Sequence, residues 1–352
     1  MYEGIAFTNP RISDFDDVFT HILDLSSKDN TYKFALARFL LDYSKSSDNL
    51  HASFETIAAY FLRYYWNIQC KYRLKQDSHL NRQPVIISIL ERHFPKSGYP
   101  EYFDEVFSDP KYAEQIKKCT RDIIDNCFND VISRFQRLKF GNKIIERKIF
   151  FEYKVGGTST NDRVYPDLKY GIDIIPEARD FLSKNYVFLT KSVILEWSRF
   201  LEKLNKGVPK IIEKTEGSIV QRNSLTKFRK QLEPFFKNCF YCHNPLKSGA
   251  ETHVDHVIPF DYIAEDEMWN FVLACNKCNC SKLGSLPPVE YMHDLISRNK
   301  EYRTKIPMLN QSLILLGVKE RDENKELWEK EIWDYYERAK SHGYMVLDKI
   351  PI

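Results

Sequence analysis

The tetrapeptides CFYC at 239–242 and CNKC at 275–278 decide how part of this chain folds. Each places two thiols three positions apart, so that one tight turn can present both to the same point. The 32 residues 243–274 separate the two pairs. Four thiols brought together in this way can bind a tetrahedral Zn²⁺ without any other ligand. We therefore predict one structural zinc site, formed by Cys239, Cys242, Cys275 and Cys278.

Three other interpretations of these cysteines stay open. The run CFYCH at 239–243 also matches the pattern for covalent haem attachment, a reaction that takes place outside the cytoplasm. A thioredoxin-like redox pair would explain one Cys-x-x-Cys motif and leave the other without a role. The four cysteines could also be unrelated. Structural zinc accounts for both motifs, and it needs neither His243 nor the surplus Cys280 as a ligand.

The composition of the whole chain fits a helix-rich globular protein. Its 352 residues are 43% hydrophobic and 29% charged, which is enough for one large core or several smaller ones. The formal net charge is +3, so a signal for a nucleic-acid partner has to be local. The N-terminus lacks a basic start followed by an apolar run, and no apolar stretch is long enough for a membrane span. We expect a cytoplasmic protein without membrane contact, whose eight cysteines do not form a disulfide framework.

Helical apolar spacing dominates the first 140 residues. It is found at 31–45, 51–74 and 111–140. The last of these segments carries the clearest apolar stripe, formed by Ile116, Cys119, Ile123, Cys127, Val131, Phe135 and Leu138. Cysteine packs as a small apolar residue, so we predict that Cys119 and Cys127 are core residues, and Cys70 as well.

The centre and the end of the chain show mixed patterns. We predict a strand at 147–155, a loop at 156–171 and an amphipathic helix at 192–207 that stops at Gly207. The chain becomes helical again after residue 284. A final acidic helix is predicted at 322–340, with a buried face formed by Leu327, Trp328, Ile332 and Tyr335.

A local excess of positive charge precedes the first cysteine pair. Residues 203–247 contain ten Lys or Arg against three Glu. We predict a basic helix at 222–237, and this helix offers four side chains for contact with nucleic acid: Arg222, Lys227, Arg229 and Lys230. The alternative is an ordinary solvated helix face.

The segment between the cysteine pairs carries a second set of polar residues. Asp255 and His256 are adjacent and are followed by Val-Ile-Pro, which suggests an interrupted strand. Asn270 stands 14 positions after His256, directly before an apolar run. Asn279 follows the last zinc cysteine, and Lys282 lies three positions later on the same face of a helix.

This order of motifs resembles the HNH endonuclease family. The residues that carry the resemblance are CFYC, VDHVIP, WNFVLAC and CNKCNCSK, which together span about 236–286. The family implies a ββα-metal fold, in which a two-stranded hairpin packs against a helix. It also implies a catalytic divalent cation between hairpin and helix, separate from the structural zinc. Phosphodiester hydrolysis needs a base for water and a cation for the phosphate, and these residue types supply both.

The resemblance assigns roles to individual residues. His256 resembles the general base, Asp255 a ligand of the catalytic metal, and Asn270 the asparagine that orients the histidine. Asn279 takes the position of the second metal ligand, where many members have histidine. Carboxylate and amide oxygens favour Mg²⁺ or Mn²⁺. Two accessory residues stay open: His253 as ligand, phosphate contact or bystander, and Lys282 as phosphate contact or helix cap.

These observations predict a mainly α protein with a small zinc-stapled ββα-metal domain. We expect a helical region of recognition or regulation at 1–145, a connector at 146–235, the HNH domain at 236–290 and a helical extension at 291–352. The predicted function is a metal-dependent endonuclease, most simply for DNA, resembling restriction and phage-defence effectors. The alternatives are an inactive zinc-stapled nucleic-acid-binding module and an RNA-cleaving nuclease. A regulatory protein or a second copy could bind through the helical regions.

Overall fold

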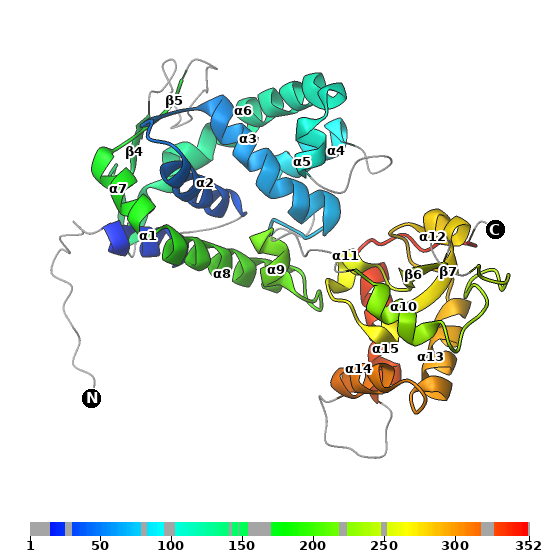
Figure 1. The fold of residues 1–352 in the computed structure, drawn as a ribbon. Coiled ribbons are helices and arrows are strands. Elements are labelled where there is room, and N and C mark those ends of the chain that lie inside the picture. Colours follow the sequence, from blue (N-terminus) through cyan, green and yellow to red (C-terminus); the bar gives the residue numbers. More distant parts are fainter. Residues whose placement is uncertain are drawn as a thin grey trace, which may run out of the picture. The chain divides into compact units, whose positions relative to one another are not determined.

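The computed structural model of the chain falls into two compact units (Figure 1). It describes residues 15–24, 30–78, 83–94, 103–140, 143–146, 148–153, 170–217, 224–247, 252–317 and 327–350. The N-terminal unit lies within 1–206 and 214–217, and the C-terminal unit lies within 207–213 and 218–352. The fold is mostly helical, as predicted. Among the described residues, no helix combines the length and the apolar composition that a membrane span requires.

Long helices with aromatic faces form the N-terminal unit. They are α1 (Phe15–Asp24), α2 (Tyr32–Ser46), α3 (Phe54–Tyr65), α4 (Val85–His93), α5 (Phe103–Ser108), α6 (Ala113–Phe135), α7 (Pro176–Lys184) and α8 (Tyr186–Leu204). The short α9 (Ile211–Glu216) follows, and its residues 214–216 belong to this unit. The helices predicted at 31–45 and 192–207 are confirmed as α2 and α8. Gly207 has a φ of +81°, which suits a stop after α8.

Small antiparallel sheets complete this unit. Strand β5 (Gly171–Ile174) lies between β1 (His51–Ser53) and β4 (Phe151–Tyr153), and β2 (Arg137–Phe140) pairs with β3 (Lys143–Glu146). The strand predicted at 147–155 is confirmed as β4 but is shorter. The helix predicted at 111–140 gives way to β2 after Phe135, so its last part was wrong. The loop predicted at 156–171 lies almost entirely outside the described residues.

The segment predicted as one helix at 51–74 is composite. It begins with strand β1, continues as α3, and ends in a π-helix, η1 (Trp66–Lys71). Cys119 and Cys127 are buried as predicted, but Cys70 is exposed. The prediction for Cys70 was wrong because the wider turns of a π-helix rotate residues out of the α-helical stripe that precedes it.

The C-terminal unit is built around one hairpin. Strand β6 (Thr252–His256) pairs antiparallel with β7 (Phe271–Cys275), so that His256 lies opposite Phe271. The turns α11 (Phe260–Ile263) and η3 (Met268–Asn270) connect the strands, and α12 (Asn276–Lys282) follows β7 directly. The order strand, strand, helix is the ββα arrangement that the resemblance implied.

Three longer helices share the core of this hairpin. They are α13 (Glu290–Tyr302), α14 (Pro307–Gly317) and α15 (Leu327–Ser341). Buried residues of the hairpin and of all three helices belong to one hydrophobic cluster. The predicted face of α15 is partly confirmed, since Trp328 and Ile332 are buried whereas Leu327 and Tyr335 are half-buried.

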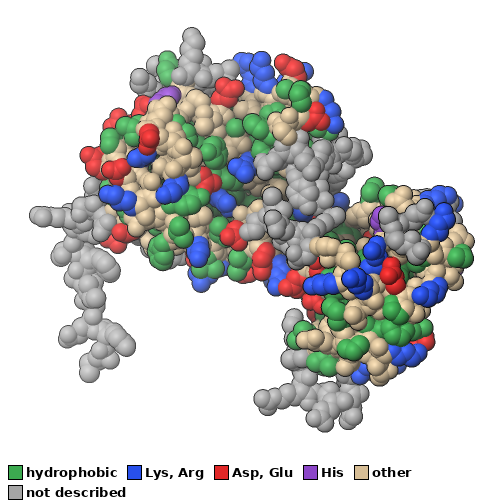
Figure 2. Space-filling view, viewed as in Figure 1, with side chains coloured by type: hydrophobic (Ala, Val, Ile, Leu, Met, Phe, Trp, Pro, Cys, Tyr) green, Lys and Arg blue, Asp and Glu red, His purple; other side chains and the backbone are tan. Residues whose placement is uncertain are grey.

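The predicted basic helix is shorter than expected. Its helical part is α10 (Thr226–Leu232), and residues 233–235 form a turn. Pro234 explains this end, since proline has no N–H for the helical ladder and disfavours helix in the residue before it. Arg222 lies outside the described residues. Figure 2 shows Lys and Arg side chains over α10.

Candidate active site

The four cysteines of the two pairs converge on one point. The Sγ atoms of Cys239, Cys242, Cys275 and Cys278 all lie within 4.8 Å of one another. The Sγ atoms of Cys242 and Cys275 are 3.9 Å apart. Four sulfurs at about 2.3 Å from a tetrahedral zinc are about 3.8 Å from each other. The thiols are therefore spaced as a zinc site requires.

Local hydrogen bonds shape this cluster. The N–H of Phe240 donates to the carbonyl of Leu273 at 2.9 Å and ties the first cysteine turn to β7. The N–H of Cys275 points to the Sγ of Cys239 at 3.4 Å. Such N–H donors stabilise a negatively charged sulfur. The backbone thus brings the first and third thiols to the same point.

The surroundings of the thiols act in opposite directions on their proton affinity. Burial raises the pKa of Cys239 and of Cys278 above the usual thiol range. Burial acts the same way on Cys275, but hydrogen bonds from the Cys278 backbone and from neighbouring thiols lower its pKa overall. A cation among them favours the thiolate form of all four. The donor set therefore fits a soft divalent ion such as Zn²⁺.

His256 lies at the end of β6, where the strand gives way to a bend. Its Nε2 is 3.1 Å from Oδ1 of Asp266. Its ring stands edge-on to Phe260 and to Phe271, with centroids 5.1 and 4.6 Å away. If Asp266 accepts the proton on Nε2, Nδ1 is the nitrogen left to accept another proton. Two aromatic rings and one carboxylate thus fix both the orientation and the tautomer of this imidazole.

Asn270 braces the chain that follows His256. Its side chain is fully buried, and it makes two hydrogen bonds with the backbone of Ile258. Oδ1 accepts from the Ile258 N–H and Nδ2 donates to the Ile258 carbonyl, both at 2.8 Å. The Asn270 carbonyl also accepts from the N–H of Val257 at 2.9 Å. The two residues after His256 are therefore held by this one asparagine.

Asp255 is enclosed by two donors. Its Oδ2 accepts a hydrogen bond of 2.5 Å from the phenol of Tyr241 and lies 3.2 Å from the Nζ of Lys282. The same Nζ donates to the carbonyl of His256 at 2.7 Å. Burial and the charge of Asp255 raise the pKa of Tyr241, so the phenol keeps its proton and donates. Oδ1 accepts no hydrogen bond from the described residues.

The comparison with protein families identifies this region. A family model described as HNH endonuclease matches residues 239–283. That span contains both cysteine turns, the β6–β7 hairpin and α12, with Asp255, His256 and Asn270 at the junction between them.

Residues 239–283 form an HNH endonuclease domain.

No curated protein and no solved structure matches the chain. The family assignment therefore concerns this domain alone.

The other predicted site residues of the HNH domain lie in different surroundings. Asn279 is half-buried on α12, and its side chain has no hydrogen-bond partner among the described residues. His253 is half-buried on β6, opposite Ala274. Lys282 is 1% exposed and reaches the end of β6, as described above.

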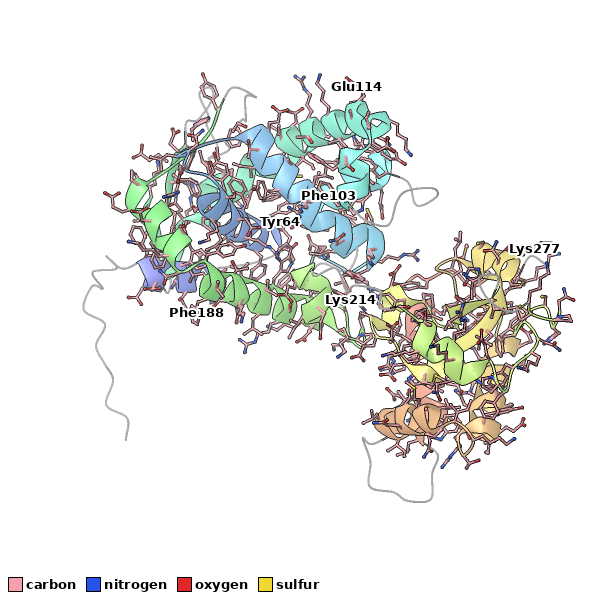
Figure 3. The ribbon with its side chains drawn as sticks, viewed as in Figure 1. Tyr64, Phe103, Glu114, Phe188, Lys214 and Lys277 are labelled. Carbon is pink, nitrogen blue, oxygen red and sulfur yellow. The ribbon has the colours of Figure 1, made fainter. Side chains whose placement is uncertain are left out.

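The predicted nucleic-acid contacts lie on α10. Lys227 and Lys230 are exposed, while the half-buried Arg229 lies 3.4 Å from Glu233. Lys277, labelled in Figure 3, marks α12.

Sequence reasoning missed two residues that contact the site. Tyr241 lies inside the first cysteine turn, and Asp266 lies in the connection between the strands. The sequence offered a weak signal for Tyr241, since a tyrosine between two zinc cysteines has little room except toward the hairpin. No pattern marked Asp266 among the three neighbouring acids Glu265, Asp266 and Glu267. Both contacts join residues that are ten or more positions apart.

Proposed function

We propose that this chain is a metal-dependent endonuclease that hydrolyses phosphodiester bonds in DNA. The observation that carries the proposal is the imidazole of His256, which Asp266 and two aromatic rings hold at the end of β6, the strand that also carries Asp255. A base held in a fixed orientation, one position along the chain from a carboxylate that can bind a cation, suits activation of water against a phosphate. The match of 239–283 to the HNH family supports the same chemistry.

Each residue then has a defined task. Nδ1 of His256 takes the proton of the attacking water, while Asp266 stabilises the imidazolium that forms. Asn270 keeps the chain after His256 in place through its two bonds to Ile258. Lys282 and Tyr241 hold Oδ2 of Asp255, which leaves Oδ1 for a ligand.

Asp255 and Asn279 are the residues that would hold the catalytic cation. One carboxylate and one amide oxygen make a hard, open donor set, which fits Mg²⁺ or Mn²⁺. When bound, such an ion supplies positive charge to the phosphate and to the departing oxygen. The four cysteines would hold the separate structural zinc.

The exposed lysines on α10 support nucleic acid as the substrate. Lys227 and Lys230 project from a helix that packs against the hairpin. Positive side chains next to a nuclease site attract the phosphate backbone, with affinity that falls as salt rises. We propose duplex DNA because the family resemblance includes restriction and phage-defence effectors. Toxicity of the wild-type gene on expression, relieved by His256→Ala, is the expected sign of that role.

One observation favours a second candidate, a binding module without catalysis. The buried ion pair between Lys282 and Asp255 also suits a carboxylate with a purely structural role. In that case the zinc, the hairpin and the α10 lysines remain useful for binding, and His256 has no reaction to serve.

A substrate panel tests the proposal. The full-length protein is incubated with supercoiled plasmid, linear duplex, single-stranded DNA and RNA, with Mg²⁺ or Mn²⁺ and with a chelator that removes them. We expect cleavage of the DNA substrates only when the cation is present. Cleavage of RNA alone would replace DNA by RNA as the substrate. Binding without cleavage of any substrate would support the second candidate and contradict the proposal.

A further inference from the structure

The N-terminal unit contains a cavity that the nuclease chemistry does not use. Its volume is about 370 Å³, which falls in the range of small-molecule sites. Its walls come from α2, α3, η1, α8 and the end of α9. Half-buried phenols and exposed cationic side chains line it together, including Tyr60, Tyr64, Tyr186, Lys45 and Arg63. Tyr64, labelled in Figure 3, marks the wall formed by α3.

One carboxylate fixes the shape of this cavity. Asp42 on α2 accepts hydrogen bonds from the phenols of Tyr64 at 2.5 Å and of Tyr186 at 2.9 Å. It also lies 3.6 Å from the guanidinium of Arg38. Burial and the charge of Asp42 raise the pKa of both phenols, so both remain donors. The charge of Asp42 is thus balanced within the wall, and the helices α2, α3 and α8 are held together around it.

Two other polar groups of the cavity have no partner. The side chains of Lys45 and Asn67 make no hydrogen bond or ion pair with the described residues. Donors that line a cavity without a protein partner point to a ligand that accepts hydrogen bonds.

The backbone at this place is also unusual. Asn67 belongs to the π-helix η1, and π-turns are frequent at functional sites. Gly217 also lines the cavity and has a φ of +63°. A Cβ at this position would lie 3.5 Å from Nδ2 of Asn67. Two irregular backbone segments therefore meet where the cavity has its free amide.

These features select the chemistry of the ligand. A metal cation is disfavoured, because three cationic side chains line the cavity and one of its two carboxylates, Asp42, is already balanced. A purely apolar ligand would leave the Lys45 ammonium and the Asn67 amide unpaired. An anion with a flat ring uses every group, since phenol rings stack on bases and Lys or Arg binds phosphate.

We propose that this cavity binds a nucleotide. The ring lies against the tyrosines, Lys45 and Arg63 take the phosphate, and the Asn67 amide donates to an acceptor of the base. The nucleotide has two possible sources, a free mononucleotide or an unpaired nucleotide within a strand. Both offer the same ring and phosphate, and the experiment separates them.

The test measures binding by calorimetry on the full-length protein. The probes are free 5′-mononucleotides, 3′,5′-cyclic mononucleotides and a short single-stranded DNA. The variants are Lys45→Glu, which reverses a charge in the cavity, and Asn67→Leu, which keeps a side chain of similar size but removes the amide. Lys118→Glu is the control, because Lys118 is exposed on α6 and this helix contributes nothing to the cavity. Circular dichroism checks that each variant is folded.

We expect Lys45→Glu to weaken nucleotide binding at least about tenfold, Asn67→Leu to weaken it several-fold, and Lys118→Glu to leave it unchanged. Binding of mononucleotides identifies a free ligand. Binding of the strand alone, with the same sensitivity to Lys45→Glu, identifies a nucleotide within a strand. The proposal is overturned if no probe binds at about 1 mM, or if binding is the same in Lys45→Glu and Lys118→Glu. No cleavage is measured, so this result is independent of the nuclease proposal.

Discussion

Each of the two units contains an asparagine whose side chain bridges the backbone N–H and carbonyl of one distant residue, but the two bridges hold different parts of the molecule. In the N-terminal unit the side chain of Asn205 bridges the backbone of Lys75, with Oδ1 accepting from the N–H at 2.7 Å and Nδ2 donating to the carbonyl at 3.0 Å. In the C-terminal unit, which contains the HNH domain and is called the HNH unit below, Asn270 bridges the backbone of Ile258 in the same way. The first bridge joins two segments of a helical scaffold, whereas the second holds the chain beside His256. Geometry alone therefore does not distinguish a structural residue from a functional one.

The units also differ in what holds them together. Stacked and edge-on aromatic pairs such as Phe34 with Trp197 and Phe61 with Phe128 fill the N-terminal core. The HNH unit has its own hydrophobic cluster, but the ends of its hairpin meet at four thiols. The N-terminal unit should therefore withstand a chelator that unfolds the HNH unit. The following predictions test this contrast, beginning with the largest effect.

Removal of one zinc ligand should have the largest effect. In Cys239→Ser we expect loss of bound zinc and a loss of at least about 5 kcal/mol from the free energy of unfolding of the HNH unit. The matched variant in the N-terminal unit, Cys119→Ala, should keep its zinc and lose about 1 kcal/mol. Metal analysis and urea unfolding of both variants measure the contrast. Full zinc content in Cys239→Ser would contradict the assignment of this thiol.

Removal of the buried ammonium at Asp255 comes next. Lys282→Met keeps the apolar stem but leaves the buried carboxylate with one donor, and we expect a loss of about 3 kcal/mol in the HNH unit. Arg38→Met breaks the corresponding ion pair with Asp42. The side chains of Arg38 and Asp42 are 17% and 18% exposed, so this variant should lose about 1 kcal/mol or less of unfolding free energy. Thermal unfolding compares the two variants. Equal losses would mean that burial does not set the strength of these pairs.

The two asparagine bridges allow the closest comparison. Asn270→Ala and Asn205→Ala each leave a backbone N–H and a carbonyl without their partner, and each should cost about 2 kcal/mol in its own unit. Only Asn270→Ala should also lower the rate of DNA cleavage at a temperature where both variants are folded. If Asn205→Ala slowed cleavage as much as Asn270→Ala, this would contradict the claim that Asn270 serves catalysis by holding the chain beside His256.

The smallest effect concerns Glu267, whose pKa is raised above 4.5 by burial. A carboxyl group with a raised pKa in the folded state stabilises the protein fully below its unfolded pKa, and this contribution is lost as pH rises through the folded pKa. Glu267→Gln should therefore be more stable than wild type at pH 7, by less than about 1 kcal/mol, and the difference should vanish near pH 4. Urea midpoints between pH 4 and 7 measure it. If the urea midpoints of wild type and Glu267→Gln changed with pH in parallel, the raised pKa of Glu267 would not contribute to stability.

The sequence predicted much of the HNH domain because metal chemistry restricts which residues can occupy a site. Zinc accepts few ligands at few spacings, so the four cysteines could be assigned before their positions were known. The same holds for the order of Asp255, His256 and Asn270. The contacts of Tyr241 and Asp266 could not be predicted, because they depend on how the strand and the turns pack.

In the N-terminal unit the sequence predicted helices but little else. Apolar periodicity identifies a buried face without saying what that face packs against. It also does not reveal a change of helix type, so the exposed position of Cys70 on η1 was missed. The ends of α6 and α10 depend on the strand β2 and on Pro234, which override the helical pattern. The cavity could not be found from sequence, since its residues come from five separate elements.

The central claim is that His256 is the base of a nuclease. The most direct measurement compares plasmid cleavage by wild type, His256→Ala and His293→Ala at equal zinc content, with Mg²⁺ or Mn²⁺ present. His293 is an exposed histidine on α13 of the same unit and serves as the control. We predict that His256→Ala retains its zinc and its fold but loses cleavage by at least about a hundredfold, while His293→Ala cleaves like wild type. Cleavage by His256→Ala at the wild-type rate would contradict the account.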